Sequence, residues 1–264
     1  MPKRPDEALS QQIEKLRYDR TSGALDLAID AIELAEGWIA AGRAPAELAR
    51  EIARMHPAIA AVTNVARLLE SDRSDLSKRL LQAKQSLVNG NRLIGENLRA
   101  LIPPKATVIT LSNSTTVRDV LVALRVRAVY VLESQPGGEG KQLAEALRSG
   151  LRPAAGTVSR QEVVHLIPDS AIGKIVPQVD CAVIGVDTFD RTGAVVHKVG
   201  TLPLALCCKH FGKAFYAVGH SLKFTERRLE DSLPEPDQAL ESQLFDCTPG
   251  DLVTRLITER KPSS

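Results

Sequence analysis

The feature that most constrains the fold of this chain is a repeated order of strand, turn and helix after Pro103-Pro104. Short apolar runs rich in β-branched residues alternate there with helical segments, and glycine or hydroxyl-bearing residues join them. Alternating elements of this length are typical of βαβ units, which form a parallel sheet covered by helices. The predicted strands are Ala106 to Leu111, Ala128 to Leu132, Val163 to Ile167, Cys181 to Val186 and Ala214 to Val218. The predicted helices begin at Thr116, run from Glu139 to Ser149 and from Ser170 to Val176, and run from Gly200-Thr201 to about Phe211.

The part of the chain before this alternation has a helical character. Its segments are rich in Ala, Leu, Glu and Arg, with apolar residues at helical spacing. They are Glu7 to Arg20, Ala24 to Ala41, Ala46 to Arg54, Ile59 to Glu70 and Leu76 to Arg99, and the stripe Leu25, Ile29, Ile32, Leu34 and Trp38 is typical of a buried helix face. We therefore predict an α/β protein with a helical domain over residues 1–103 and a parallel-sheet domain over residues 104–264.

Composition limits the class of protein. A chain of 264 residues suits two domains, and 34 basic against 32 acidic residues give no reason to expect a nucleic-acid partner. The charged N-terminus lacks the apolar core of a signal peptide, and no window approaches the roughly 18 apolar residues of a membrane span. Four cysteines show neither a C-x-x-C pair nor a His/Cys ligand spacing. We expect a cytoplasmic protein with reduced thiols, no metal, no cofactor and no membrane contact.

The loops that follow the strands are the places to look for a site, because ligands of parallel sheets collect at the carboxyl ends of the strands. The first such loop contains Ser114, Thr115 and Thr116 and enters a helix. Hydroxyls and free backbone N–H groups would converge there at the positive end of the helix dipole, which favours an anion. The alternative is ordinary N-capping of the helix by Ser114 or Thr115.

The second loop, Glu133 to Lys141, is rich in glycine but matches no nucleotide motif. It lacks both G-x-G-x-x-G and the Gly-Lys-Ser/Thr of a Walker loop, so nucleotide hydrolysis is unsupported. A turn followed by a helix start explains it equally well.

The third loop follows the strand Cys181 to Val186. Asp187 at the strand end could transfer a proton or only cap a turn. Lys198 with Gly200-Thr201 at a helix start is a second candidate phosphate site, because it combines a point charge with backbone donors. A lone histidine such as His197 is more often a packed or surface residue than a catalyst.

Several short motifs then occur in the order seen in one superfamily. From about Thr107 to Glu259 the chain resembles the alpha, beta and delta regulatory subunits of eukaryotic initiation factor 2B, together with methylthioribose-1-phosphate isomerase and ribose-1,5-bisphosphate isomerase. The motifs include Glu133-Ser134-Gln135-Pro136, Pro168-Asp169-Ser170-Ala171, Gly185-Val186-Asp187, His197-Lys198-Val199-Gly200-Thr201 and Asp246-Cys247-Thr248-Pro249. The resemblance implies a Rossmann-like C-terminal domain, a phosphorylated sugar or nucleotide bound between the domains, and dimerisation through the C-terminal domains.

Departures from the isomerase pattern bear on activity. Ser112 stands where the isomerases carry a cysteine, and its hydroxyl is far less acidic than a thiol. Asp187 is kept, His197-Lys198 replaces Asn-Lys, and Gln135 replaces an arginine as in the alpha regulatory subunit. Residues 152–162 look like an insertion.

Two hypotheses follow. The first is a regulatory initiation factor 2B-like protein that binds a phosphorylated metabolite, forms a homodimer or higher homo-oligomer and acts through protein partners. The second is an aldose-ketose isomerase of a sugar 1-phosphate, with Asp187 as acid/base. In both, the expected ligand-binding residues are Ser114, Thr115, Thr116, Gln135, His197, Lys198, Gly200 and Thr201, with Ser112 at the cysteine position. Whether the chain is an enzyme is left open between them.

Overall fold

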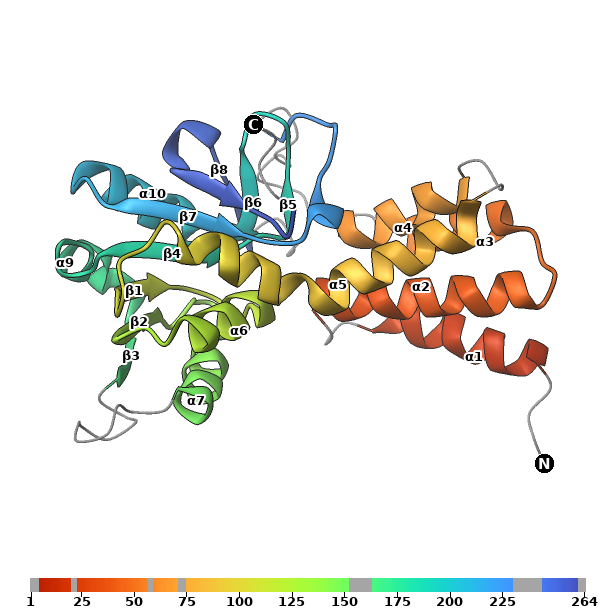
Figure 1. Cartoon of the computed structure of the whole chain (residues 1–264), viewed down its shortest axis with the longest axis horizontal. Coiled ribbons are helices and arrows are strands. Elements are labelled where there is room, and N and C mark those ends of the chain that lie inside the picture. The colour runs from red at the N-terminus through yellow and green to blue at the C-terminus, as the bar shows by residue number, and fades with distance from the viewer. Residues whose placement is uncertain are drawn as a thin grey trace. The chain divides into compact units, whose positions relative to one another are not determined.

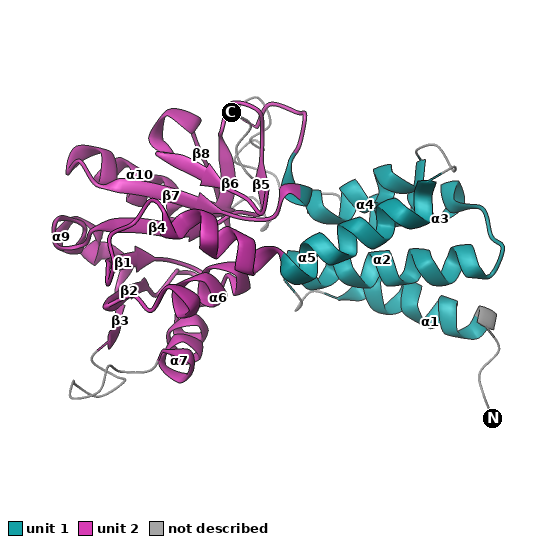
Figure 2. Ribbon diagram, viewed as in Figure 1, with its two compact units in different colours: residues 1–89, 222–224 teal, residues 90–221, 225–264 magenta. Residues whose placement is uncertain are grey.

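The computed structural model describes residues 5–19, 23–56, 59–70, 75–151, 163–229 and 244–260 (Figure 1). The apparent insertion at residues 152–162 lies outside these ranges. The chain divides into two compact units, residues 1–89 with 222–224 and residues 90–221 with 225–264 (Figure 2).

The first unit is helical, as its composition predicts. Its helices are α1 (Pro5–Tyr18), α2 (Ala24–Ala40), α3 (Pro45–Met55), α4 (Ala60–Glu70) and the N-terminal part of α5 (Leu76–Arg99). Ile32, Leu34 and Trp38 of the predicted stripe are buried, while Leu25 and Ile29 pack partly buried against the same core. The indole N–H of Trp38 donates to the carbonyl of Ala44 at 3.0 Å.

The division between the units falls inside α5, between Asn89 and Gly90. The change in sequence character at Pro103-Pro104 instead lies between α5 and the first strand. Residues 222–224 join the helical unit because the side-chain amide of Asn64 donates to the carbonyls of Leu222 and Phe224, at 2.6 and 2.7 Å. The assignment of residues 1–103 and 104–264 as separate domains stays a prediction.

The second unit contains the predicted parallel sheet, so the expected α/β fold class is confirmed. Six strands lie in the order β3-β2-β1-β4-β7-β9, and every recorded pair is parallel. They are β1 (Thr107–Thr110), β2 (Ala128–Leu132), β3 (Val164–Ile167), β4 (Cys181–Gly185), β7 (Ala214–Val218) and β9 (Arg255–Ile257). The strand order reverses between β1 and β4, which is where ligands of such sheets collect.

Helices cover both faces of this sheet. Ile94 of α5, Val120 of α6 (Thr115–Leu124) and Leu143 of α7 (Gly140–Gly150) share one apolar core with alternate strand residues. The helix α10 (Thr201–His210) contacts β4 and β7, and its buried residues lie outside that core. Figure 1 shows α10 and α6 on opposite sides of the strands.

One predicted helix is broken into shorter turns. The segment predicted from Ser170 to Val176 consists of a 3-10 turn (Asp169–Ala171), α9 (Ile172–Ile175) and a second 3-10 turn (Val176–Gln178). Pro177 lies in the first turn of the second 3-10 segment, where its missing N–H leaves no helical hydrogen bond unmade.

A second sheet was not predicted. It is antiparallel, in the order β5-β6-β8, and consists of β5 (Thr188–Phe189), β6 (Val195–Lys198) and β8 (Phe245–Thr248). The sequence interpretation ended the short apolar run at Val196 and placed His197 and Lys198 after it, whereas both residues lie within β6. β5 and β6 form a hairpin, and β8 pairs with β6 from a distant part of the chain. The sequence around them therefore does not alternate between strand and helix.

The cysteines behave as predicted. All four are free, Cys181, Cys208 and Cys247 are buried, and Cys207 is half-buried. Burial raises the pKa of the Cys181 and Cys208 thiols to about 12. Across the described helices, no segment combines the length and apolar character needed to cross a bilayer. The described residues also hold no cluster of three His, Cys, Asp or Glu side chains suited to a metal ion.

Candidate functional site

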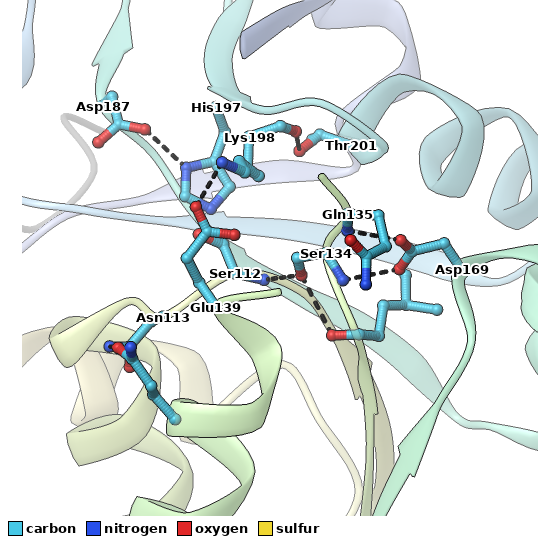
Figure 3. Close-up of polar contacts among 12 residues, drawn as sticks. Ser112, Asn113, Ser134, Gln135, Glu139, Asp169, Asp187, His197, Lys198 and Thr201 are labelled. Atoms are coloured by element: carbon cyan, nitrogen blue, oxygen red, sulfur yellow. Dashed lines mark hydrogen bonds and ion pairs between the residues drawn. The ribbon is translucent and has the colours of Figure 1, made fainter. Parts of the chain in front are cut away.

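The candidate site lies in the second unit, around the ends of β1, β2 and β4 and along β6 (Figure 3). The loop after β1 begins with Ser112, whose backbone adopts the left-handed conformation with φ of 64°. Its N–H donates to the hydroxyl oxygen of Ser134 at 2.7 Å. This bond ties the loop after β1 to the loop after β2.

Ser114 is the N-cap of α6. Its hydroxyl oxygen accepts the N–H of Val117 at 3.3 Å, so the capping interpretation of this residue is confirmed. Thr115 is half-buried and Thr116 is buried at the start of the helix. Because the cap is a neutral hydroxyl, the positive end of the α6 dipole is not neutralised by it.

Gly185 allows the end of β4 to approach this cap. A Cβ at Gly185 would lie 2.6 Å from Ser114 Oγ and 3.2 Å from Cε1 of His197. A side chain at this position would therefore push against both residues. The missing side chain therefore lets Ser114 and His197 both lie against the backbone of Gly185.

Asp187 and His197 form a hydrogen-bonded pair. The Nδ1 atom of His197 lies 2.8 Å from Asp187 Oδ2, and the two side chains are 6% and 32% exposed, respectively. Because an ionised carboxylate only accepts hydrogen bonds, it holds the imidazole proton on Nδ1. The Nε2 atom is buried without a hydrogen-bond partner among the described residues. The pair can thus present Nε2 to a ligand.

Lys198 forms a partly buried ion pair with Glu139. Its Nζ contacts Glu139 Oε1, and the Lys198 side chain is only 6% exposed. The second carboxylate oxygen of Glu139 is buried and has no partner in the described part of the chain. Glu139 was not chosen as a site residue from the sequence, where it is one of the two acidic residues in the loop Glu133 to Lys141.

Gly200 and Thr201 lie at the start of α10, where the sequence suggested a phosphate site. The backbone N–H groups of Gly200 and Leu202 donate to Asp246 Oδ2, at 2.9 and 3.1 Å. The hydroxyl of Thr201 donates to the carbonyl of Lys198 at 2.6 Å and is fully buried. The carboxylate of Asp246 therefore already accepts N–H groups at the start of α10, where the sequence suggested a phosphate.

Asp246 reaches this position from the second sheet. It lies directly opposite His197 in the β6–β8 pairing. Burial raises the pKa of its carboxyl above the ordinary value, while the N–H groups that it accepts and the nearby His197 lower it. Only its presence in the motif shared with the initiation factor 2B family could have drawn attention to it.

Gln135 belongs to a separate part of the site. Both carboxylate oxygens of Asp169 accept backbone N–H groups, one from Ser134 at 2.8 Å and one from Gln135 at 2.7 Å (Figure 3). The Gln135 residue itself is exposed. Asp169 therefore fixes the backbone of the loop after β2, a role that the sequence did not reveal.

The arrangement combines one ion pair, one histidine-carboxylate pair and two helix starts at one edge of the sheet. Figure 3 shows this edge with Ser112, Asp187, His197 and Lys198. Ser134, the neighbour of Gln135, accepts the N–H of Ser112. Such a set of donors and acceptors is suited to a polar ligand. The described contacts of Ser112 include no base that would activate its hydroxyl.

Comparison with known proteins agrees with the resemblance. The model of the initiation factor 2 subunit family matches residues 42–260. The translation initiation factor eIF-2B subunit 2-like protein of Pyrococcus horikoshii is 29% identical over 227 residues, covering 81% of this chain and 78% of that protein. Methylthioribose-1-phosphate isomerase of Synechococcus is 32% identical over 213 residues, covering 69% and 60%.

A solved structure has the same fold. The crystal structure of Pyrococcus horikoshii translation initiation factor eIF-2B superposes with a TM-score of 0.75 at 26% identity, covering 98% of this chain and 96% of that one. The family match and the shared fold together identify the group of proteins concerned. The chain belongs to the initiation factor 2 subunit family.

Proposed function

We propose that this protein binds a phosphorylated sugar or nucleotide at the carboxyl edge of its parallel sheet and acts in regulation through protein partners. The observation that carries this proposal is the burial of Lys198 beside the Asp187–His197 pair. Burying charged groups is costly unless they are paired, and charged side chains gathered at the edge of a parallel sheet are suited to binding a charged ligand.

Binding is better supported than turnover because of the residue at position 112. The isomerases that the chain resembles carry a cysteine there, and this chain has Ser112. A serine hydroxyl needs a base to become reactive. The Ser112 N–H is held by Ser134, and Asp187 is paired with His197.

Oligomerisation is part of the proposal. One structure with the same fold is that of a tetrameric eIF2B beta-delta complex from Chaetomium thermophilum, at 17% identity to this chain. We propose a homodimer or higher homo-oligomer formed through the parallel-sheet unit. The molar mass in solution, measured by light scattering, would contradict this if it matched one chain at all concentrations.

The binding proposal is tested with a thermal-shift screen of sugar phosphates and nucleotides. A ligand at about one hundred times its Kd should stabilise the folded protein by about 2.7 kcal/mol. The shift should be lost in Lys198→Met and kept in Lys209→Met, because Lys209 pairs with Asp251 on the exposed end of α10. A screen without any binder, or equal binding by both variants, would contradict the proposal.

The second candidate function is an aldose-ketose isomerase of a sugar 1-phosphate. The Asp187–His197 pair favours it, because a buried imidazole with an unpartnered Nε2 can exchange a proton with a substrate. Each binder from the screen should be assayed for conversion to the ketose. Turnover that disappears in Asp187→Asn, with the fold intact, would support the isomerase. Tight binding without turnover, unchanged in Asp187→Asn, would contradict it. A gain of turnover in Ser112→Cys would show that the site is otherwise still competent for the reaction.

A further inference from the structure

A partly buried ion pair joins Lys198 of β6 to Glu139, the residue before α7. We propose that the carboxylate of Glu139 occupies the position on Lys198 that a ligand anion would take. By competing with the ligand, Glu139 determines the affinity and selectivity of the site for anions. This inference rests on the proposed function insofar as Lys198 is taken to contact the ligand. It goes further by assigning to Glu139 a role that the family resemblance does not supply.

The geometry of the glycine-rich loop supports a seated carboxylate. Glu139 immediately precedes α7, and its side chain folds back over the loop to reach Lys198 on β6. A Cβ at Gly137 would lie 2.6 Å from Glu139 Cδ and 2.7 Å from Oε2. The Glu139 carboxylate therefore occupies the space that a side chain at position 137 would need.

Electrostatics make this carboxylate a competitor for ligands. With Glu139 on Lys198, an incoming anion meets a negative charge where it would otherwise meet a positive one. Asp187 and Asp246 add two further carboxylates around His197. Like charges repel more strongly where they are shielded from water than in bulk solvent.

The same contact provides selectivity. The Glu139 side chain is 31% exposed, so it can swing toward solvent when a stronger anion takes its place. A phosphate dianion carries about twice the charge of a carboxylate and three strong acceptor oxygens. It can displace Glu139, whereas a singly charged carboxylate ligand gains little by exchanging with it. The site should therefore discriminate phosphorylated ligands from carboxylates.

The experiment uses inorganic phosphate as the probe, titrated calorimetrically into the full-length protein at constant ionic strength and a pH where the dianion dominates. Glu139→Gln should bind phosphate about tenfold more tightly than the wild type, because the competing charge is gone. Glu139→Gln should also bind acetate measurably, so the preference for phosphate over acetate should fall. The matched control is Glu145→Gln on the exposed face of α7, which removes the same charge and should bind like the wild type.

A second variant tests the same proposal if Glu139→Gln folds poorly. Gly137 is not among the glycines with a left-handed φ, so an alanine is compatible with its backbone. The new methyl group of Gly137→Ala would push the carboxylate of Glu139 off Lys198. Phosphate affinity should rise by a smaller factor, about threefold. If neither variant binds phosphate more tightly than the wild type and Glu145→Gln, the proposal is wrong.

The outcomes separate this inference from the proposed function. A gain in Glu139→Gln that disappears in the double variant Glu139→Gln, Lys198→Met assigns the anion site to Lys198 and supports the inference. The same gain in a protein that binds no sugar phosphate or nucleotide would support the inference and sink the proposed function. A gain that survives in the double variant would place the phosphate elsewhere and overturn the inference.

Discussion

Two helices start at the edge of the sheet that carries the candidate site, and they are capped in different ways. The N-terminus of α6 is capped by the neutral hydroxyl of Ser114, and that of α10 by the carboxylate of Asp246. Both starts resemble anion cradles in sequence. The carboxylate of Asp246 offsets the positive end of the α10 dipole, whereas the neutral Ser114 hydroxyl does not offset that of α6. The same local pattern thus yields one potential binding element and one structural element.

The largest expected effect comes from removing the carboxylate cap. Asp246→Ala should reduce the free energy of unfolding of the parallel-sheet unit by about 3 kcal/mol, because the N–H groups of Gly200 and Leu202 lose their acceptor. Chemical denaturation followed by far-UV circular dichroism would measure it. Hydrogen exchange should show earlier opening of α10. The control is Asp251→Ala. It removes an exposed ion pair with Lys209, and this loss should leave stability unchanged. Equal losses in both variants would refute a specific cap.

A somewhat smaller effect is expected where β4 approaches the Ser114 cap. Gly185→Ala should cost about 2 kcal/mol, because the new methyl group would overlap the Ser114 side chain and crowd His197. Gly173→Ala is the matched control, since nothing lies within 4 Å of its added Cβ. Comparable melting temperatures for the two variants would show that the close approach at Gly185 is not required.

Removing the hydroxyl cap of α6 should reduce the free energy of unfolding less than removing the carboxylate cap of α10. Ser114→Ala should lower stability by about 1 kcal/mol, the usual cost of removing one N-cap bond. Ser149→Ala, which removes an exposed hydroxyl bonded to the carbonyl of Glu145, should change it by less than about 0.5 kcal/mol. If Ser114→Ala destabilises as much as Asp246→Ala, the contrast between the two caps does not hold.

The smallest effect concerns pH. The pKa of Asp246 is raised in the folded protein, chiefly by burial, so the native state holds its proton more tightly than the unfolded chain does. This contribution to stability is fully present below the unfolded pKa of about 3.9 and is lost as pH rises through the folded value. The stability of the wild type relative to Asp246→Asn should therefore decline over that interval. A difference that is constant with pH would contradict the raised pKa.

The two units differ in how much of them the sequence predicts. The described helices of the first unit begin and end within two residues of their predicted limits, because apolar spacing and Pro45 mark them locally. The strands β1 to β4 and β7 were predicted for the same reason. The β5-β6-β8 sheet was not, since β8 joins β6 from a distant part of the chain.

The sequence predicted several side chains of the candidate site but not the residues with which they form hydrogen bonds and ion pairs. The sequence indicates Asp187, His197 and Lys198 as candidates, yet the partners that determine their properties come from elsewhere. Glu139 reaches Lys198 from the loop after β2, and Asp246 reaches the start of α10 from β8. Local patterns show which groups could bind an anion, and only tertiary contacts show which of them are already neutralised.

The position of Trp38 has a practical consequence for all of these measurements. It is the one tryptophan of the chain and it is buried in the helical unit, with the guanidinium of Arg43 4.6 Å from its ring centroid. Its fluorescence therefore reports on the helical unit, while circular dichroism reports on both units. A denaturation in which the two signals diverge would show that the units unfold separately, and coincident curves would show that they unfold as one cooperative body.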